Sequence, residues 1–277
     1  MIRVDAHHHV WDLARGDYGW LTPDLAIHRD YMLADFRPLL GDIAATVLVQ
    51  AAPTEAETAF LLDVAARSDN LVRGVVGWAD LAAPDAPARI AALSRNGTLK
   101  GLRPMLQDIT DTAWILRSNV RPALQAMAQH GLRFDALIRP RHLPMMLELA
   151  ASHPNLLIVI DHGAKPAIAQ GTFQPWAKDI ARVARDTEAF CKLSGLVTEA
   201  ASDWRVDDLR RYVDHLIDCF GPQRLMWGSD WPVVVLGGGH TAWCAASQEL
   251  LRGLDEASRD AIFGDTACTF YSLDTPA

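Results

Sequence analysis

The chain has 277 residues, and its content of 50% hydrophobic and 22% charged residues describes a folded protein with a substantial core. A formal net charge of −8 gives phosphate backbones and anionic membrane surfaces no general attraction, so we expect neither nucleic acid nor membrane as a partner. The four cysteines lack CxxC spacing, and the N-terminal residues lack the apolar stretch of a signal peptide. These features predict a cytoplasmic protein with reduced thiols.

Short aliphatic runs alternate with amphipathic stretches along the chain, the pattern of repeated βα units around a parallel sheet. The predicted strands are Arg3–His9, Ala45–Gln50, Val72–Trp78, Leu99–Pro104, Arg133–Ile138, Leu156–His162, Ala189–Ser194 and Arg224–Asp230. Eight such units in one domain favour a closed (β/α)8 barrel, typically of about 250 residues, over an open doubly wound sheet. We therefore predict one α/β domain, a TIM barrel spanning residues 1–277.

Helix signals lie between the predicted strands. Thr54 and Glu57 have the spacing of a capping box that opens a helix over residues 54–68. A second helix is expected to end at His130 and a third to cover residues 206–220, because a glycine follows each of them. These helices would form part of the outer layer of the barrel.

Polar side chains follow the apolar runs where the first, sixth and eighth strands end. Because side chains alternate along a strand, His7 and His9 are expected to project to the same face while His8 points away. The carboxyl ends of barrel strands share one mouth, where this pair can meet His162 and Asp230. Imidazole nitrogens and a carboxylate are ligands that Zn²⁺ accepts, so the sequence indicates a candidate metal site.

Six separated motifs resemble those of the amidohydrolase superfamily, in the sugar-lactonase branch that includes L-fuconolactonases and L-rhamnono-lactonases. They are DAHHHVWD at 5–12, GDYGWL at 16–21, KGLRP at 100–104, IDHGAKP at 160–166, CKLSGLVTEA at 191–200 and MWGSDWPV at 226–233. The resemblance covers nearly the whole chain and implies a (β/α)8 barrel. It also implies His7 and His9 as the first-strand pair, His162 on the sixth strand and Asp230 on the eighth.

The same resemblance limits the number of metal ions. Binuclear members of the superfamily place a bridging Lys or Glu on the fourth strand and a histidine on the fifth. Here the fourth strand offers Arg103, and the fifth contains no histidine. We therefore expect one divalent ion, taken to be Zn²⁺, bound by a subset of His7, His9, His162 and Asp230, and we leave open whether catalysis needs it.

The resemblance implies hydrolysis of a small sugar lactone, of the L-fucono- or L-rhamnono-lactone type, to the aldonic acid. Water would attack the lactone carbonyl, with Asp230 as general base and then general acid. His162 and Arg103 would polarise the carbonyl oxygen. The same residues serve this scheme with or without a metal ion.

Several residues are expected to contact the substrate. Trp78 and Trp231 could offer aromatic faces to the ring carbons of a sugar. His28, on the long insertion over residues 11–37, and Lys165, in the sixth-strand motif, are the polar candidates. The expected partner is thus a small lactone, and the sequence leaves the oligomeric state open.

Three alternatives to sugar-lactone hydrolysis remain: hydrolysis of a dicarboxylate or sulfonated lactone, aromatic decarboxylation, and ligand binding without catalysis. A dicarboxylate would need an anion clamp, for which Arg103 could be joined by Arg139, Arg141 or Lys165. Lys192 interrupts an apolar seventh strand, and we expect either it or Lys165 to support the site from behind.

Overall fold

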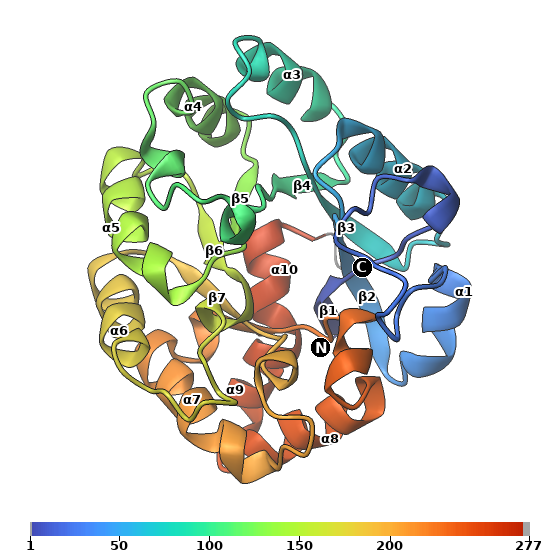
Figure 1. Ribbon diagram of the computed structural model, residues 1–277, viewed down its shortest axis with the longest axis vertical. Helices are drawn as coiled ribbons and strands as arrows, with labels where there is room; N and C mark the ends of the chain where they lie inside the picture. The colour runs from blue at the N-terminus through green and yellow to red at the C-terminus, as the bar shows by residue number, and fades with distance from the viewer. Residues whose placement is uncertain (1, 274–277) are drawn as a thin grey trace.

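Eight parallel strands form the centre of the computed structural model, which describes residues 2–273 (Figure 1). They are β1 (Arg3–His8), β2 (Ile43–Val49), β3 (Val72–Gly77), β4 (Leu99–Leu102), β5 (Arg133–Ala136), β6 (Ile158–Ile160), β7 (Phe190–Leu193) and β8 (Leu225–Trp227). The sheet order follows the chain order, and a parallel bridge between His8 and Trp231 joins the first strand to the segment after the last. The predicted (β/α)8 barrel is confirmed.

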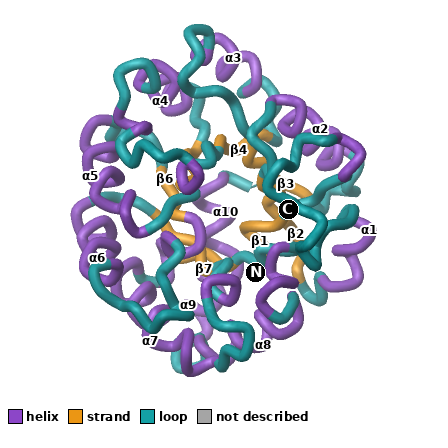
Figure 2. The backbone as a smooth tube through the Cα atoms, viewed as in Figure 1, coloured by secondary structure: helices purple, strands orange, loops and turns teal. Residues whose placement is uncertain are grey.

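Most helices surround the strands as an outer ring, whereas α10 (Thr266–Tyr271) lies at the centre of the view (Figure 2). The helices are α1 (Leu33–Phe36), α2 (Glu55–Ala66), α3 (Ala86–Leu93), α4 (Arg121–Gln129), α5 (Leu143–Ser152), α6 (Trp176–Asp186), α7 (Val206–Phe220), α8 (His240–Leu250), α9 (Glu256–Asp260) and α10 (Thr266–Tyr271). The predicted helix over 206–220 is confirmed at both ends, and the one predicted to end at His130 ends one residue earlier. No helix among the described residues is long and apolar enough to cross a bilayer.

The α7 helix shows why these segments form the outer layer. Its buried residues include Leu209, Val213, Leu216 and Phe220, whose spacing of three or four places them on one face. That face packs against the strands while the opposite face is polar. Gly221 ends the helix with a φ of 66°, a left-handed conformation that costs a glycine little.

A second hydrophobic core fills the interior of the barrel. Inward-facing residues of the strands, such as Val4 and Val47, pack there against Phe270 and Tyr271 of α10. The Nε atom of Arg133, at the start of β5, donates to the Phe270 carbonyl at 2.6 Å, which places α10 at the amino-terminal end of the barrel. That end is therefore closed, and the chemistry must occur at the opposite mouth.

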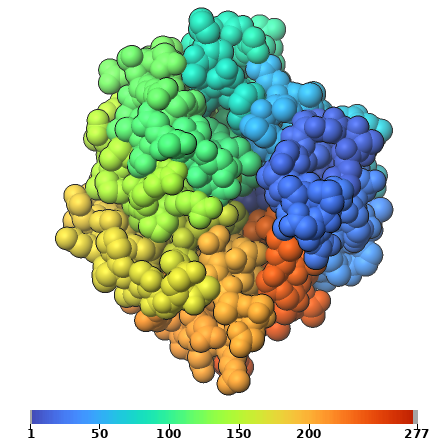
Figure 3. Space-filling view, viewed as in Figure 1, coloured from blue at the N-terminus to red at the C-terminus, as the bar shows by residue number. Residues whose placement is uncertain are grey.

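The insertion after β1 covers part of that mouth. Trp11 and Tyr31 pair as an antiparallel bridge at its base, and the Trp11 indole donates to the Arg29 carbonyl at 2.7 Å. Farther along the insertion, the Trp20 indole donates to the Ala51 carbonyl after β2, also at 2.7 Å. Figure 3 shows this N-terminal segment in blue, meeting green and orange segments around a central hollow.

The sixth and eighth strands end earlier than predicted. The chain leaves the sheet after Ile160 and after Trp227, and it enters left-handed backbone conformations at His162 (φ 55°) and Asp230 (φ 57°). Such conformations cost a residue other than glycine about 1–3 kcal/mol, so the surrounding contacts must hold them. The two polar residues thus lie on turns beyond the strands, which re-aims their side chains toward the mouth.

Candidate active site

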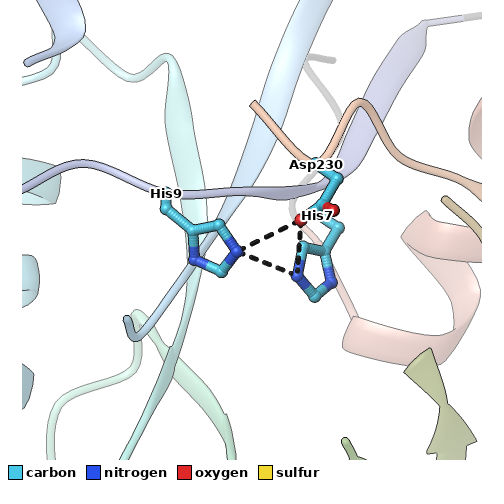
Figure 4. Close-up of side chains that lie close together, drawn as sticks. All are labelled: His7, His9 and Asp230. Carbon is cyan, nitrogen blue, oxygen red and sulfur yellow. Dashed lines mark hydrogen bonds and ion pairs between the residues drawn. The ribbon is translucent and has the colours of Figure 1, made fainter. Parts of the chain in front are cut away.

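Three side chains converge where β1 meets the segment after β8 (Figure 4). The Nε2 atoms of His7 and His9 lie 3.2 Å apart. Oδ1 of Asp230 lies 3.4 Å from Nε2 of His9 and 3.7 Å from Nε2 of His7. All three residues are buried, so the strand alternation and the strand-end position of Asp230 bring the predicted group together.

Backbone hydrogen bonds fix this arrangement. The amide of Asp230 donates to the His7 carbonyl at 2.8 Å, and the amide of His9 donates to the Trp231 carbonyl at 2.6 Å. Beneath them, Oδ1 of Asp5 accepts from the amides of His7 at 3.0 Å and Ser229 at 2.9 Å. The closure of the barrel is therefore also what positions the three side chains.

His162 approaches Asp230 from the turn after β6. Its Nε2 atom lies 3.9 Å from Oδ1 of Asp230, and its Nδ1 atom lies 2.8 Å from the Ser194 hydroxyl. The turn leaves no room for a side chain at Gly195, where a Cβ would lie 2.5 Å from Nδ1 of His162. The seventh strand thus supplies both the hydrogen-bond partner and the space that orient this imidazole.

Burial and mutual contacts determine the charges of the group. Burial lowers the pKa of His9, and it lowers the pKa of His162 to about 4. Burial also lowers the pKa of His7, with the Lys192 ammonium as the next contribution. Burial opposes the ionisation of Asp230, but the neighbouring imidazoles, His162 first, outweigh it and lower its pKa. At neutral pH the site therefore holds one carboxylate among three neutral imidazoles.

His8 faces away from the mouth. Its ring stacks on Phe36 with a centroid distance of 4.7 Å, and its Nε2 atom lies 2.9 Å from the Thr46 hydroxyl. The residue thus belongs to the packing between β1, β2 and α1.

A buried ionic network lies behind His7. The Lys192 ammonium contacts Oδ2 of Asp135 at 2.6 Å, Oδ1 of Asp161 at 3.1 Å and Nδ1 of His7 at 3.1 Å. Oδ2 of Asp135 also accepts from the Tyr271 hydroxyl at 2.5 Å. Of the two lysines considered from the sequence, Lys192 is therefore the one behind the site, and it compensates two carboxylates that burial would otherwise disfavour.

Arg103 connects this network to the mouth. Its Nη1 atom lies 3.2 Å from Oδ2 of Asp161 and 3.3 Å from Nε2 of His7, and its Nη2 atom donates to the Gln50 carbonyl. The Nε atom is buried and has no hydrogen-bond partner among the described residues. A guanidinium has five N–H donors, so Arg103 can still donate to an oxygen atom of a bound molecule.

A cavity of about 220 Å³ opens above this group. It is lined by His9, Trp20, Ala51, Arg103, Met105, Gln107, Asp108, Leu137, His162, Lys165, Asp230 and Val233. Apolar and polar side chains share the lining, which is typical of sites for small polar molecules.

Three residues predicted to contact the substrate lie outside the cavity lining: Trp231, Trp78 and His28. Trp231 is buried and stacks on Phe36 with a centroid distance of 4.6 Å, because the backbone turn at Asp230 directs the two neighbouring side chains differently. Trp78 is half-buried and His28 is exposed, and neither lines the cavity. Lys165 does line it, as predicted, although its ammonium lies 3.5 Å from Oε1 of Glu199.

The cavity also contains residues other than the predicted substrate contacts. Trp20, in the GDYGWL motif, takes the place expected for Trp78 or Trp231. Sequence reasoning missed Gln107 and Asp108, which lie on a 3-10 turn after β4 where no sequence pattern predicts the direction of the side chains. For Asp161 the sequence offered an indirect signal: Lys192 lies inside an apolar strand, and a buried lysine requires a carboxylate nearby.

The donor atoms at the mouth fit one divalent ion. Zn–N bonds of about 2.0–2.1 Å allow a single ion to contact two imidazole nitrogens 3.2 Å apart, as in His7 and His9. Nδ1 of His9 lies 2.7 Å from the Val49 carbonyl, the kind of second partner that orients a ligating imidazole. Oδ1 of Asp230 completes a three-donor group, with His162 beside it.

Among the described residues a second group of possible ligands, His7, Asp161 and His162, shares His7 with the first, but its surroundings disfavour a bridged second ion. Arg103 occupies the mouth end of β4, where a bridging ligand would be needed, and a cation cannot serve as one. The carboxylates of Asp135 and Asp161, on β5 and after β6, are already engaged by Lys192 and Arg103.

The HxH pair, the histidine after the sixth strand and the aspartate after the eighth lie at the carboxyl ends of the strands, the position of the active site in barrel enzymes. The chain belongs to the amidohydrolase family, whose model matches residues 4–273. The predicted family is thereby confirmed.

Several known proteins resemble the chain over its full length. An L-fucono-1,5-lactonase from Burkholderia ambifaria is 45% identical, with 99% of this chain and 97% of that protein aligned. An L-fucono-1,5-lactonase from Burkholderia multivorans is 35% identical, with 100% and 98% aligned. The crystal structure of an amidohydrolase from Burkholderia multivorans with bound zinc has a TM-score of 0.92 and 34% identity, covering 99% of this chain and 100% of that one.

A probable 2-pyrone-4,6-dicarboxylic acid hydrolase from Acinetobacter baumannii has a TM-score of 0.82 but only 16% identity, over 99% of this chain and 100% of that one. This likeness shows a shared fold.

Proposed function

We propose that the chain hydrolyses a neutral sugar lactone, of the L-fucono-1,5-lactone type, to its aldonic acid. The observation that carries this proposal is the Asp230 carboxylate, held among His7, His9 and His162 at the floor of a small cavity. The lactonases that are 45% and 35% identical to the chain support the same reaction.

Lactone hydrolysis needs a proton acceptor for the attacking water and a proton donor for the leaving alcohol. Asp230 is ionised at neutral pH and lines the cavity, so it can take the proton from water and return it to the ring oxygen as the C–O bond breaks. Arg103 can donate a hydrogen bond to the carbonyl oxygen as negative charge develops there. His162 lies beside Asp230 and helps to hold the same oxygen.

A divalent ion bound by His7, His9 and Asp230, with His162 beside it, would supply Lewis-acid polarisation of the carbonyl. Zn²⁺ suits this set of nitrogen and oxygen donors, and the zinc-bound structure at 34% identity supports that choice. Since an ester needs less activation than an amide, the roles of Asp230 and Arg103 do not depend on the ion.

Part of the cavity lining offers apolar surface that suits the carbon side of a sugar ring. The indole nitrogen of Trp20 is occupied by the Ala51 carbonyl, so its ring offers carbon surface to the cavity, next to Met105 and Leu137. Such surface suits the ring carbons or a methyl group of a deoxy sugar.

Arg103, Lys165 and Arg141 each already contact an acceptor within the chain, which argues against a doubly anionic lactone. Arg103 contacts Asp161, and Lys165 contacts Glu199. Arg141 donates to the carbonyls of Gln107 and Ile109, and Arg139 does not line the cavity. These contacts disfavour the anion clamp considered from the sequence, because uncompensated charge is costly in a partly desolvated site.

Turnover of a panel of substrates, followed with a pH-indicator dye, tests the proposal. We expect proton release with six-carbon and 6-deoxy sugar lactones and no carbon dioxide release from hydroxybenzoates. Decarboxylation without lactone hydrolysis would replace the proposal with the lyase alternative, and inactivity on both would support a binding protein.

A further inference from the structure

We propose that Gln107 and Asp108 select the substrate by accepting hydrogen bonds from its hydroxyl groups. This inference rests on the proposed function, because it assigns the element of the lactone cavity that recognises hydroxyls. Both residues line the cavity, on the 3-10 turn Leu106–Asp108 after β4.

Gln107 offers an acceptor that the protein leaves unused. Its Nε2 atom donates to Oδ2 of Asp108 at 3.3 Å, which directs the amide nitrogen away from other partners. Its Oε1 atom is buried and has no hydrogen-bond partner among the described residues. A buried acceptor without a partner is costly, and a hydroxyl of a bound molecule would relieve that cost.

Asp108 differs from the other charged residues of the cavity. Arg103, Lys165 and Asp230 each have a titratable side chain of this chain within 4.0 Å. Within residues 2–273, the side chain of Asp108 instead contacts the neutral amide of Gln107. Its carboxylate can therefore accept from two hydroxyl groups of a ligand, whereas it would repel an anionic one.

The turn that carries the pair is held rigidly. The Gln107 amide donates to the Leu137 carbonyl at 3.0 Å, and the Asp108 amide donates to the Met105 carbonyl at 3.0 Å. Arg141 donates to the carbonyl of Gln107 at 3.3 Å and to that of Ile109 at 2.9 Å. The backbone that carries the acceptors is thus fixed before the substrate arrives, which limits the entropy lost on binding.

Two lactones distinguish hydroxyl recognition from a structural role. L-Fucono-1,5-lactone presents hydroxyl groups to the pair, whereas δ-valerolactone has the same reacting ester and none. We expect Asp108→Asn and Gln107→Leu each to lower kcat/KM for the fuconolactone about tenfold, mainly through KM, because each weakens a hydrogen bond to the substrate. For δ-valerolactone we expect a change of no more than about twofold. If its turnover is too slow to measure, its inhibition constant against the fuconolactone gives the same comparison.

The matched control is Asp218→Asn on the exposed face of α7, which changes the net charge equally and should alter neither substrate. Equal losses on both lactones, or no loss on either, would overturn the inference. Failure of the proposed function would look different, because the unaltered protein would then hydrolyse no sugar lactone at all.

Discussion

Asp230 remains ionised in a place where burial alone would favour its neutral form. Its side chain is almost inaccessible to solvent, and burial raises its pKa. Interactions with His162, His9 and His7 outweigh that effect and hold the pKa of Asp230 below the ordinary value of an aspartate. The residue is consequently a carboxylate at neutral pH, the form that can accept a proton from a reacting water.

Replacing Asp230 with asparagine tests this role. The change keeps the size of the side chain but removes the proton acceptor, so kcat/KM for a sugar lactone should fall about 10²–10⁴-fold while the circular dichroism spectrum is preserved. Activity within a few-fold of the unaltered protein would make Asp230 a structural residue. His8→Ala is the matched control, because His8 packs on Phe36 outside the cavity. This substitution should lower the melting temperature while leaving kcat largely unchanged.

Strand alternation was enough to predict at this scale that His7 and His9 converge and that His8 does not. The apolar strand around Lys192 indicates a buried carboxylate nearby, but it does not identify the partners, because Asp135, Asp161 and Tyr271 come from three distant segments. The tryptophan contacts were misplaced for a similar reason, since the path of the insertion decides that Trp20 and not Trp78 reaches the cavity.

At the scale of single elements, the start of α2 is the clearest departure from expectation. Thr54 accepts from the Glu57 amide at 3.0 Å, as a capping box requires. The Glu57 carboxylate does not return the contact to Thr54, and it accepts instead from the Ala51 amide at 2.8 Å. Because the Ala51 carbonyl holds Trp20, this inward turn of Glu57 supports the wall of the cavity.

Glu57 should make stability depend on pH. Burial raises its pKa to about 7, the Ala51 amide and Tyr18 oppose that shift, Asp17 adds to it and Arg15 lowers it. The folded state therefore retains a proton that the unfolded chain releases near pH 4.5, so this contribution to stability is complete below that pH and is lost as pH rises toward 7. Its size is at most about 3 kcal/mol.

Urea unfolding of Glu57→Gln and the unaltered protein at pH 5 and pH 8 measures this contribution. The difference in free energy of unfolding between the variant and the unaltered protein should shift in favour of the variant when the pH rises from 5 to 8. Since the other groups that titrate in this range are common to both proteins, parallel pH dependences would contradict the raised pKa of Glu57.

At the scale of the whole molecule, repeated βα periodicity was sufficient to predict the barrel. The pattern could not give the closing contacts between β1 and the segment after β8, which depend on the turn at Asp230. It also could not show that α10 closes the amino-terminal end, because such a helix has no distinct signature.

The proposed single metal site depends on the assembled mouth and predicts a stoichiometry. Elemental analysis of protein purified without chelators should find no more than one equivalent of a divalent metal, expected to be zinc, per chain. Two tightly bound equivalents would contradict the absence of bridging ligands. A metal-free preparation that retained activity would assign catalysis to Asp230 and Arg103 alone.

The charges around the cavity lead to the central claim that the substrate is a neutral lactone. The nearby cations are engaged by Asp161, Glu199 and backbone carbonyls, and Asp108 adds negative charge at the rim. The most direct test is kcat/KM for L-fucono-1,5-lactone and for 2-pyrone-4,6-dicarboxylate, measured with the same buffer and metal. We predict a ratio of at least about tenfold in favour of the sugar lactone, or ~1.4 kcal/mol of discrimination. A ratio that favours the dicarboxylate would contradict the account.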